Sequence, residues 1–402
     1  MSDPLAPTDE GAIANAVGEA ANAREPLAII GNGTKTGMLR PVQAARSLST
    51  RNLTGITLYS PNELIISARA GTPLADIQAA LAERGQHIIA EPPDLATIYG
   101  ASGQQTLGGV IATNLSGPRR IAWGAMRDHV LGIRAVTGHG EAIHSGGRVL
   151  KNVTGLDLCK LLTGSHGTLG VITEVTLKVL PAPQAVGTIV LADLDAAAGV
   201  AALSAALGSP YSVSAAAWLP AEATARIPAL AGFGRSATLA RIEDFASSVA
   251  YRTARLRGEL GHERCEILDN APSQAVWRAI GNLTALAAEP ADAIWRISVR
   301  PSAGPVVLRT LSESVGARGY LDWGGGLVWI AAPATVAAHA AVVAAVTAAG
   351  GTWLLMRATQ SLRTAVDVIP PESEHLARIT QRVKAALDPR GILNPGRLYG
   401  GM

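Results

Sequence analysis

Hydrophobic and polar residues alternate most clearly over residues 171–179. Val175, Leu177 and Val179 are each followed or preceded by a polar residue along this stretch. A period of two places the apolar side chains on one face of a strand and the polar ones on the other. The pattern therefore predicts a half-buried strand that ends at Pro181, which cannot continue a ladder of hydrogen bonds.

A helical period is found earlier in the chain. Apolar residues recur at intervals of three and four between Leu74 and Leu81. We expect Thr72 to be the N-cap of this helix and Pro73 its first residue. Gly85 is well placed to end it.

Shorter patterns predict the remaining elements. The expected strands are 27–30, 63–70, 129–137, 141–145, 294–299 and 327–331, and the expected helical segments lie within 1–25 and over 334–349. The segments 129–137 and 141–145 flank Gly138-His-Gly140 and indicate a hairpin. Strands and helices joined by short connections are typical of an α+β fold.

Composition excludes several classes of protein. The chain has 402 residues, of which 48% are hydrophobic and 16% charged, as in globular proteins of two or three domains. Five of its 34 basic residues are lysines, and no basic run or nucleic-acid-binding module is present. Residues 330–350 are too rich in alanine to favour a bilayer, and residues 1–10 lack the pattern of a secretory signal. We therefore expect a cytoplasmic protein that binds no nucleic acid.

Cysteine and histidine residues do not form a metal-binding pattern. Only Cys159 and Cys265 are present, which fits a reducing compartment and is too few for a cysteine-ligated iron–sulfur cluster. No pair among the eight histidines has the spacing of a helical metal site. His139 and His144 flank the expected hairpin turn, and we interpret them as residues of a simple turn. We expect no metal in this chain.

Two glycine-rich segments carry the first functional signal. One is Ile30-Gly-Asn-Gly-Thr-Lys-Thr-Gly37, directly after an expected strand, and the other is Thr106-Leu-Gly-Gly-Val-Ile-Ala-Thr-Asn-Leu-Ser-Gly117. Glycine allows backbone N–H groups to approach an oxyanion closely, and the neighbouring hydroxyl and amide side chains add short donors. Together the segments indicate a phosphorylated ligand held from two sides, although either one alone also fits a tight turn.

The first segment matches neither of two common phosphate-binding motifs. A Rossmann fingerprint requires its third glycine one residue earlier, and Pro41 follows shortly. A Walker loop requires Gly-Lys-Ser/Thr, whereas Lys35 follows Thr34.

A third motif identifies the family. The run Gly164-Ser-His-Gly-Thr-Leu-Gly-Val-Ile-Thr173, preceded by residues 151–163, resembles the FAD-binding domain of the vanillyl-alcohol-oxidase superfamily, also called the PCMH type. Together with Gly117-Pro-Arg-Arg120 and Leu393-Asn-Pro-Gly396, it makes the chain similar to the FAD-binding subunits (E subunits) of bacterial glycolate oxidases. Leu156 departs from the family, in which tyrosine is common at that position.

The resemblance implies the domain organisation. Residues 1–182 are expected to form a PCMH-type FAD-binding domain of two α+β subdomains, about 1–95 and 96–182, with a boundary at Pro181-Ala-Pro183. Residues 183–360 would form a smaller α+β cap domain on the substrate side. Residues 361–402 would return to pack on the FAD-binding domain.

The resemblance also implies the cofactor and its contacts. The residues that match the family's FAD contacts are Gly31, Asn32, Gly33, Thr34, Lys35, Thr106, Gly108, Gly109, Thr113, Asn114, Gly117, Gly170 and Ile172. Where flavin is attached covalently in this superfamily, a histidine or cysteine in these segments forms the bond, and the two glycine-rich segments contain neither. We therefore expect FAD to be bound non-covalently.

The implied function is oxidation of glycolate to glyoxylate, with a catalytic flavoprotein subunit and an iron–sulfur subunit as partners and membrane contact only through them. Two alternatives remain open: a self-sufficient FAD-dependent dehydrogenase of another 2-hydroxy acid or alcohol, and a structural subunit whose flavin is redox-silent. The histidine-rich metal motif of related 2-hydroxy-acid enzymes is absent. Bleaching of the flavin by substrate would separate these alternatives.

An arginine is the candidate that we name for substrate binding. Arg296 and Arg300 lie four residues apart on the expected strand 294–299 and its end, so both should point to one face. A guanidinium offers two parallel donors to a carboxylate. A surface strand with two solvated arginines explains the pattern equally well. We also expect Arg119 and Arg120 to contact flavin phosphate or another subunit.

Overall fold

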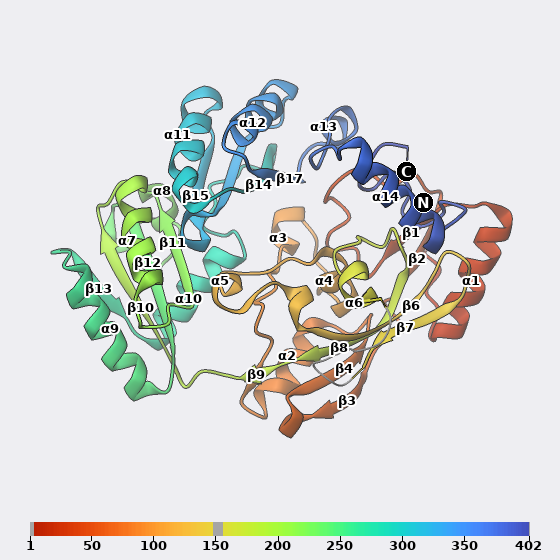
Figure 1. Cartoon of the computed structure of the whole chain (residues 1–402), viewed down its shortest axis with the longest axis horizontal. Coiled ribbons are helices and arrows are strands. Elements are labelled where there is room, and N and C mark those ends of the chain that lie inside the picture. The colour runs from red at the N-terminus through yellow and green to blue at the C-terminus, as the bar shows by residue number, and fades with distance from the viewer. Residues whose placement is uncertain (1–3, 148–155, 402) are drawn as a thin grey trace. The chain divides into compact units, whose positions relative to one another are not determined.

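The computed structural model describes residues 4–147 and 156–401. Contacts divide the chain into two units (Figure 1). Unit 1 contains residues 1–116, 125–182 and 371–402, and unit 2 contains residues 117–124 and 183–370. Residues 151–155, which belong to the segment that precedes the run Gly164–Thr173 of the third motif, lie outside the described residues.

Unit 1 is built on a five-stranded antiparallel sheet with the strand order β3-β4-β8-β6-β7. The strands of unit 1 are β1 (Leu27–Ile30), β2 (Arg46–Ser49), β3 (Ile56–Ser60), β4 (Ile65–Arg69), β5 (Gln86–His87), β6 (Val130–Val136), β7 (Ala142–Gly146), β8 (Val171–Lys178) and β9 (Leu180–Pro181). Strands β1 and β2 form a separate parallel pair, and β5 pairs with β9.

The helices of unit 1 enclose two apolar clusters. They are α1 (Glu10–Ala23), α2 (Leu74–Ala82), α3 (Ala96–Tyr99), α4 (Leu107–Thr113), α6 (Leu158–Leu162) and α14 (Glu374–Leu387), with short 3-10 turns η1 (Pro61–Glu63) and η2 (Met126–His129). One cluster lies between the sheet, α2 and α4. The other joins α1 and β1 to Ile392 and Leu393 of the C-terminal segment. The C-terminal segment is thus part of the core of unit 1.

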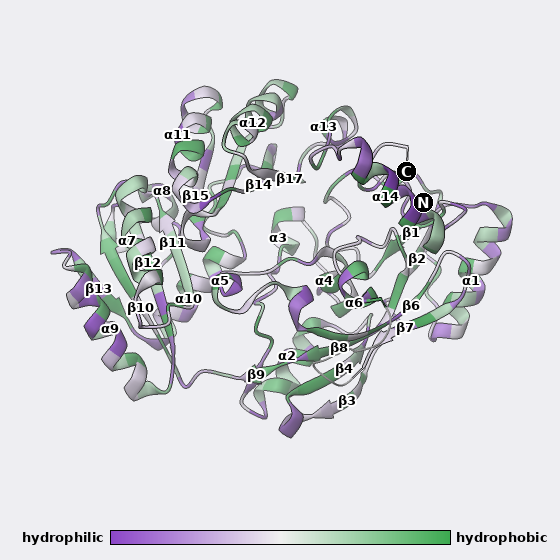
Figure 2. Ribbon diagram, in the orientation of Figure 1, coloured by the Kyte–Doolittle hydropathy of each residue, from purple (hydrophilic) through white to green (hydrophobic). Residues whose placement is uncertain are grey.

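Unit 2 is built on an eight-stranded antiparallel sheet with the order β13-β10-β12-β11-β15-β16-β14-β17. Its strands are β10 (Ala185–Ala192), β11 (Ala215–Leu219), β12 (Ala237–Asp244), β13 (Cys265–Leu268), β14 (Asp292–Ser298), β15 (Arg318–Asp322), β16 (Leu327–Pro333) and β17 (Thr352–Arg357). Hydrophobic residues dominate these strands, whereas α9 is more hydrophilic (Figure 2).

Helices complete unit 2. They are α5 (Arg120–Trp123), α7 (Ala196–Gly208), α8 (Ala221–Thr224), α9 (Ala246–Leu260), α10 (Asn270–Gly281), α11 (Gly304–Val315), α12 (Val336–Ala348) and α13 (Gln360–Ala365), with 3-10 turns η3 (Ala231–Phe233), η4 (Pro301–Ala303) and η5 (Trp323–Gly325). Within the described ranges of both units, no helix is long and apolar enough to cross a membrane.

The elements that the sequence patterns predicted are present, although they are fewer than half of the strands and helices of the structure. The alternating stretch is β8, the helical one is α2, and the expected hairpin is the antiparallel pair β6 and β7. The predicted N-cap of α2 is wrong: Pro73 occupies that position, and the Thr72 hydroxyl instead accepts a hydrogen bond from Gly55 N at 3.0 Å. The Thr72 hydroxyl is thus bound to the loop between β2 and β3.

Candidate functional site

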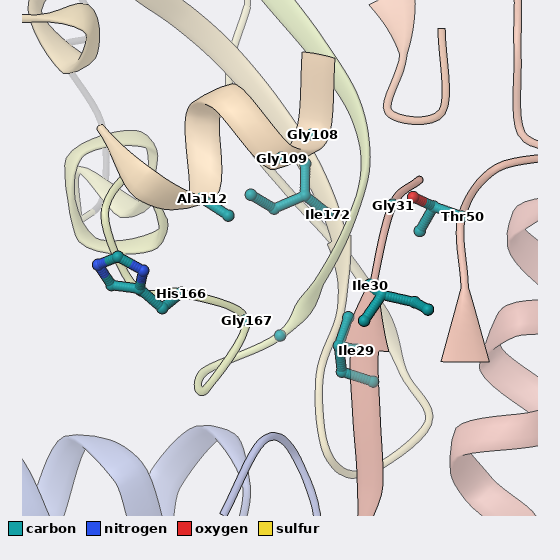
Figure 3. A pocket seen from close by; sticks show the side chains of 11 residues that line it. Ile29, Ile30, Gly31, Thr50, Gly108, Gly109, Ala112, His166, Gly167 and Ile172 are labelled. Carbon is teal, nitrogen blue, oxygen red and sulfur yellow. The ribbon is translucent and has the colours of Figure 1, made fainter. Parts of the chain in front are cut away.

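A cavity of about 70 Å³ lies within unit 1 where four segments of the chain meet (Figure 3). They are the end of β1 with Gly31, Thr50 after β2, the helix α4, and the loop that leads into β8 together with the start of that strand. The cavity is lined by Ile29, Ile30, Gly31, Thr50, Gly108, Gly109, Ala112, His166, Gly167, Gly170 and Ile172. Both glycine-rich segments and the third motif therefore contribute to one site.

Close backbone approaches explain the glycines of this cavity. A Cβ atom on Gly31 would lie 2.4 Å from Thr106 Oγ1, closer than any real contact of that kind. Thr106 is in turn the N-cap of α4, and its hydroxyl accepts a hydrogen bond from Gly109 N at 3.3 Å. The first glycine segment is thus packed directly against the start of the second.

Five of the predicted cofactor contacts line the cavity. They are Gly31, Gly108, Gly109, Gly170 and Ile172. Two others hold the glycine segments together, because Asn32 Nδ2 donates to Gln104 O at 2.9 Å and Lys35 Nζ donates to Gln105 Oε1 at 3.0 Å. Between them, Gly33 has a left-handed backbone with φ of 72°, and Thr34 is buried.

The other predicted contacts have structural partners. Thr113 Oγ1 donates to Gly109 O at 3.0 Å, and Asn114 Oδ1 accepts from Arg127 N at 3.0 Å. Gly117 belongs to unit 2, where its carbonyl accepts a hydrogen bond from Trp323 Nε1 at 3.2 Å. These three residues do not line the described cavity, so their contact with a cofactor stays a prediction.

Lys35 supplies positive charge beside the first loop. Burial lowers the pKa of its ammonium to about 8, although the nearby Asp94 carboxylate acts in the opposite direction. Its one side-chain hydrogen bond to a described residue goes to the neutral amide of Gln105. A buried ammonium without a directly paired carboxylate is suited to meet an anionic ligand.

Sequence reasoning missed several residues of the cavity wall. His166 is one of them, and Figure 3 shows its ring near Ala112 of α4, on the side opposite Thr50. Burial and the positive charge of Arg397 lower the pKa of His166 to about 3, so its imidazole is neutral. The third motif, which contains residue 166, was the signal that could have identified His166 as a wall residue. Thr50 follows β2 and lies in no motif, so no pattern in the sequence pointed to it.

Asn394 connects the walls of the cavity. Its Oδ1 accepts a hydrogen bond from Ile29 N at 2.7 Å, and its Nδ2 donates to His166 O at 2.8 Å. The side chain is only 4% exposed, and a Cβ on Gly167 would lie 2.7 Å from its Nδ2. One C-terminal side chain therefore fixes the separation between β1 and the loop before β8.

The shape and chemistry of the cavity suit the pyrophosphate of FAD. Its volume of about 70 Å³ is smaller than that of a cavity of about 150 Å³ that binds benzene, so it suits a compact group better than a flavin or adenine ring. Its glycine-lined wall and the ammonium of Lys35 suit a compact anion. Contact of Gly31, Gly108, Gly109 and Lys35 with the cofactor's phosphates stays a prediction.

Unit 2 contains a separate cluster of arginines around one tryptophan. The guanidinium carbons of Arg120 and Arg296 lie 4.5 and 4.9 Å from the ring centroid of Trp323. Burial and the charge of Arg120 lower the pKa of Arg296 to about 10, although Asp322 acts in the opposite direction. Among described residues, the Arg296 guanidinium has no hydrogen-bond partner, so its N–H fork is available to an anion.

One sequence-based expectation about arginines is wrong, and a second stays a prediction. Arg300 lies beyond the end of β14 and is exposed, so it does not share a strand face with Arg296. Arg119 binds Glu243 of β12 through Nε and Nη2, at 3.0 and 2.5 Å, and its expected contact with flavin phosphate or another subunit stays a prediction. Burial alone would raise the pKa of Glu243, but Arg241 and Arg119 together lower it to about 2.

Comparisons with known proteins also indicate an FAD-binding domain. A family model described as an FAD binding domain matches residues 5–146. The chain is 33% identical over 390 residues to the glycolate oxidase subunit GlcE of Escherichia coli (strain K12), covering 96% of this chain and 97% of that protein. It is 30% identical over 197 residues to the glycolate oxidase subunit GlcD of Bacillus subtilis (strain 168), covering 48% of this chain and 40% of that one.

The fold is similar to that of a solved structure. p-Cresol methylhydroxylase with bound substrate matches 98% of this chain and 88% of its own with a TM-score of 0.72, at 14% identity. This likeness confirms the predicted α+β fold of the PCMH type.

Substitution of Lys35 tests the charge beside the first loop. We predict that Lys35→Met weakens FAD binding by about tenfold to a hundredfold, because a hydrogen bond to a charged group contributes about 1.5–3 kcal/mol. Lys35→Arg, the matched control, should bind nearly as tightly as the wild type. The measurement is titration of apoprotein with FAD, followed by flavin fluorescence. Equal affinities for the methionine and arginine variants would contradict the assignment.

In the same titration, the affinity for FAD should fall as the pH rises above about 8. The ammonium is protonated below about pH 8, the pKa of Lys35 without ligand, and an anionic ligand favours that form. Above pH 8, binding must take up a proton, so affinity should fall by up to about tenfold per pH unit. Lys35→Met should lack this decline, and a decline of the same size in that variant would assign it to another group.

Asn394→Asp tests the connection between the walls. An aspartate keeps the acceptor for Ile29 N but cannot donate to His166 O, and it tolerates the left-handed backbone of residue 394, where φ is 46°. We expect FAD to bind about tenfold more weakly, since an unsatisfied buried group costs about 1–3 kcal/mol. Asn52→Asp in the exposed loop after β2 is the control. Unchanged affinity in Asn394→Asp would show that the wall position does not depend on this bond.

Proposed function

The chain belongs to the family of the glycolate oxidase subunit GlcE, and on that basis we propose that it is the FAD-binding subunit of a glycolate oxidase complex that converts glycolate to glyoxylate. The observation that carries the proposal is the cavity in which Gly31, Gly108 and Gly109 face the loop of the third motif. That cavity offers a glycine-lined surface suited to a pyrophosphate, and Lys35 of the first glycine-rich segment adds an ammonium.

FAD, when bound, supplies the two-electron acceptor for oxidation of the alcohol carbon. The residues of this chain provide binding and orientation. The backbone around Gly108 and Gly109 and the ammonium of Lys35 would balance the charge of the phosphates. We infer that the cofactor is not covalently attached, so that acid denaturation releases it into the supernatant.

Arg296 is our candidate for binding the carboxylate of the substrate. Its guanidinium lies on the Trp323 ring, and its N–H groups have no hydrogen-bond partner among described residues. Arg120 on the same ring adds a second positive charge. A planar guanidinium can bind both oxygens of a 2-hydroxy carboxylate at once, which orients the neighbouring carbon. Stacking on Trp323 keeps the guanidinium plane in one orientation.

The wider assembly follows from the family. We propose that a larger flavoprotein subunit and an iron–sulfur subunit bind this chain and that electrons leave through the iron–sulfur subunit. We also place the assembly in the cytoplasm, with membrane contact only through the partners. The subunit names GlcE and GlcD of the relatives support an assembly of several chains.

Anaerobic reduction of the bound flavin tests the catalytic part of the proposal. If this chain oxidises substrate itself, glycolate should bleach the visible flavin band of the purified chain. Arg296→Gln should then require about ten to a hundred times more glycolate for half-maximal bleaching, since the charge-assisted bond contributes about 1.5–3 kcal/mol. Arg300→Gln, the exposed control, should behave like the wild type.

Two results would change the assignment. An unbleached band in the isolated chain, followed by bleaching after addition of the larger flavoprotein subunit, would place the oxidation step on that partner. Bleaching by D-lactate or another 2-hydroxy acid in preference to glycolate would instead favour a self-sufficient dehydrogenase of that acid.

A further inference from the structure

A second cavity lies in unit 1 on the other side of the loop that forms the proposed phosphate site. It has a volume of about 280 Å³. Its apolar wall consists of Leu161, Leu169, Ile379, Val383, Leu398 and Tyr399. The two cavities share the loop before β8, because His166 and Gly167 line the first and Thr168 and Leu169 line the second. None of the residues expected to contact FAD or substrate lines the second cavity.

The ammonium of Lys384 and the hydroxyl of Thr380 in this wall are already hydrogen-bonded, whereas the buried Ser165 Oγ has no partner among the described residues. Lys384 Nζ donates to Thr168 O at 2.7 Å, to Asp388 Oδ2 at 2.7 Å and to Leu393 O at 3.1 Å. Thr380 Oγ1 donates to Glu372 Oε1 at 2.8 Å. The ammonium therefore has no donor left for an anion, and an apolar group is the suitable occupant.

The apolar surface continues beyond the cavity along α14. Leu376 is 52% exposed and Ile379 is 45% exposed, and Leu161 on the opposite wall is 37% exposed. Leu376, Ile379 and Val383 recur at helical spacing and form one stripe, although α14 has no fully buried residue. Exposed apolar surface around an apolar cavity is typical of a protein-binding site, since a small ligand would not cover Leu376.

Positive charge borders this stripe. Arg378 and Arg382 lie one turn apart on the exposed surface of α14. At about 100° per residue, Arg382 lies beside Ile379 on the helix surface. Neither arginine forms an ion pair with a residue in the described ranges. A partner that covers the stripe would therefore gain by presenting carboxylates to them.

We propose that α14 and this cavity, together called the α14 groove (residues 161–169, 376–384 and 398–399), bind an acidic amphipathic segment of the larger flavoprotein subunit. The segment inserts one or two large apolar side chains into the cavity and sets carboxylates against Arg378 and Arg382. A cavity of about 150 Å³ holds one benzene ring, so 280 Å³ has room for such an anchor. The inference rests on the proposed assembly but not on the proposed flavin chemistry.

Two other macromolecular occupants fit the groove less well. A second copy of this chain, related by a two-fold axis, would bring the same arginines towards each other, and like charges repel. A membrane presents a flat surface that cannot fill a cavity, and α14 has only two arginines beside its apolar stripe. A concave apolar surface with a basic border matches an amphipathic segment in a groove.

Co-expression of the full chain with the larger flavoprotein subunit from the same organism tests this inference. We predict that Ile379→Glu weakens the association by about 30-fold, the effect of an anchor residue. Arg378→Glu combined with Arg382→Glu should also weaken it, and added salt should weaken the wild-type complex. The matched control is Val336→Glu on α12, where the valine is 59% exposed, and it should associate like the wild type.

Association is measured by co-purification and native mass spectrometry, and the FAD content of each variant by its visible spectrum. Normal FAD content in Ile379→Glu separates loss of docking from loss of the flavin site. Hydrogen exchange should show protection of residues 374–387 only in the complex.

Four outcomes would overturn the proposal. They are equal association of Ile379→Glu and Val336→Glu; no association of the wild type; a wild-type dimer that Ile379→Glu converts to a monomer; and flotation of the isolated chain with phosphatidylcholine–phosphatidylglycerol vesicles that depends on Ile379. The third would assign the groove to a second copy of this chain and the fourth to a lipid surface.

Discussion

The candidate flavin site depends on one buried amide. Asn394 holds β1 and the loop before β8 at a fixed separation, since its Oδ1 accepts from Ile29 N and its Nδ2 donates to His166 O. Leu393 beside it is fully buried in the cluster that includes α1 and β1. The C-terminal segment thus joins two walls of a cavity whose lining residues lie more than 200 positions earlier. Loss of this bond would leave the glycine segments intact but without a fixed opposite wall.

The same loop links two surfaces with different chemistry. Towards α4, His166 and Gly167 face a small cavity suited to phosphate, and towards α14, Thr168 and Leu169 face an apolar groove. Lys384 connects the groove to the C-terminal segment through its bonds to Thr168 O and Leu393 O. A partner bound at α14 would therefore contact the loop that forms one wall of the phosphate site. Cofactor binding and subunit assembly would then stabilise the same short segment.

Local sequence signals predicted the parts of the site but not how they meet. Period-two alternation identified β8, and glycine spacing identified the segments around Gly31 and Gly108, because these features depend on near neighbours along the chain. The contribution of Thr50 and the capture of Arg119 by Glu243 depend on contacts between distant segments. Thr72 shows the same limit, since a loop residue competes for the hydroxyl that a helix end would use. The motif at Leu393–Gly396 predicted the return of the chain but not the bonds made by Asn394.

The affinities of FAD and riboflavin for the apoprotein, measured with ADP as a competitor, test the central claim most directly. If the glycine-lined cavity holds the pyrophosphate, FAD should bind at least about a hundredfold more tightly than riboflavin, since several charge-assisted hydrogen bonds of about 1.5–3 kcal/mol each would be lost. ADP should displace FAD. Equal affinities for FAD and riboflavin, with no displacement by ADP, would contradict the assignment of this cavity to the cofactor's phosphates.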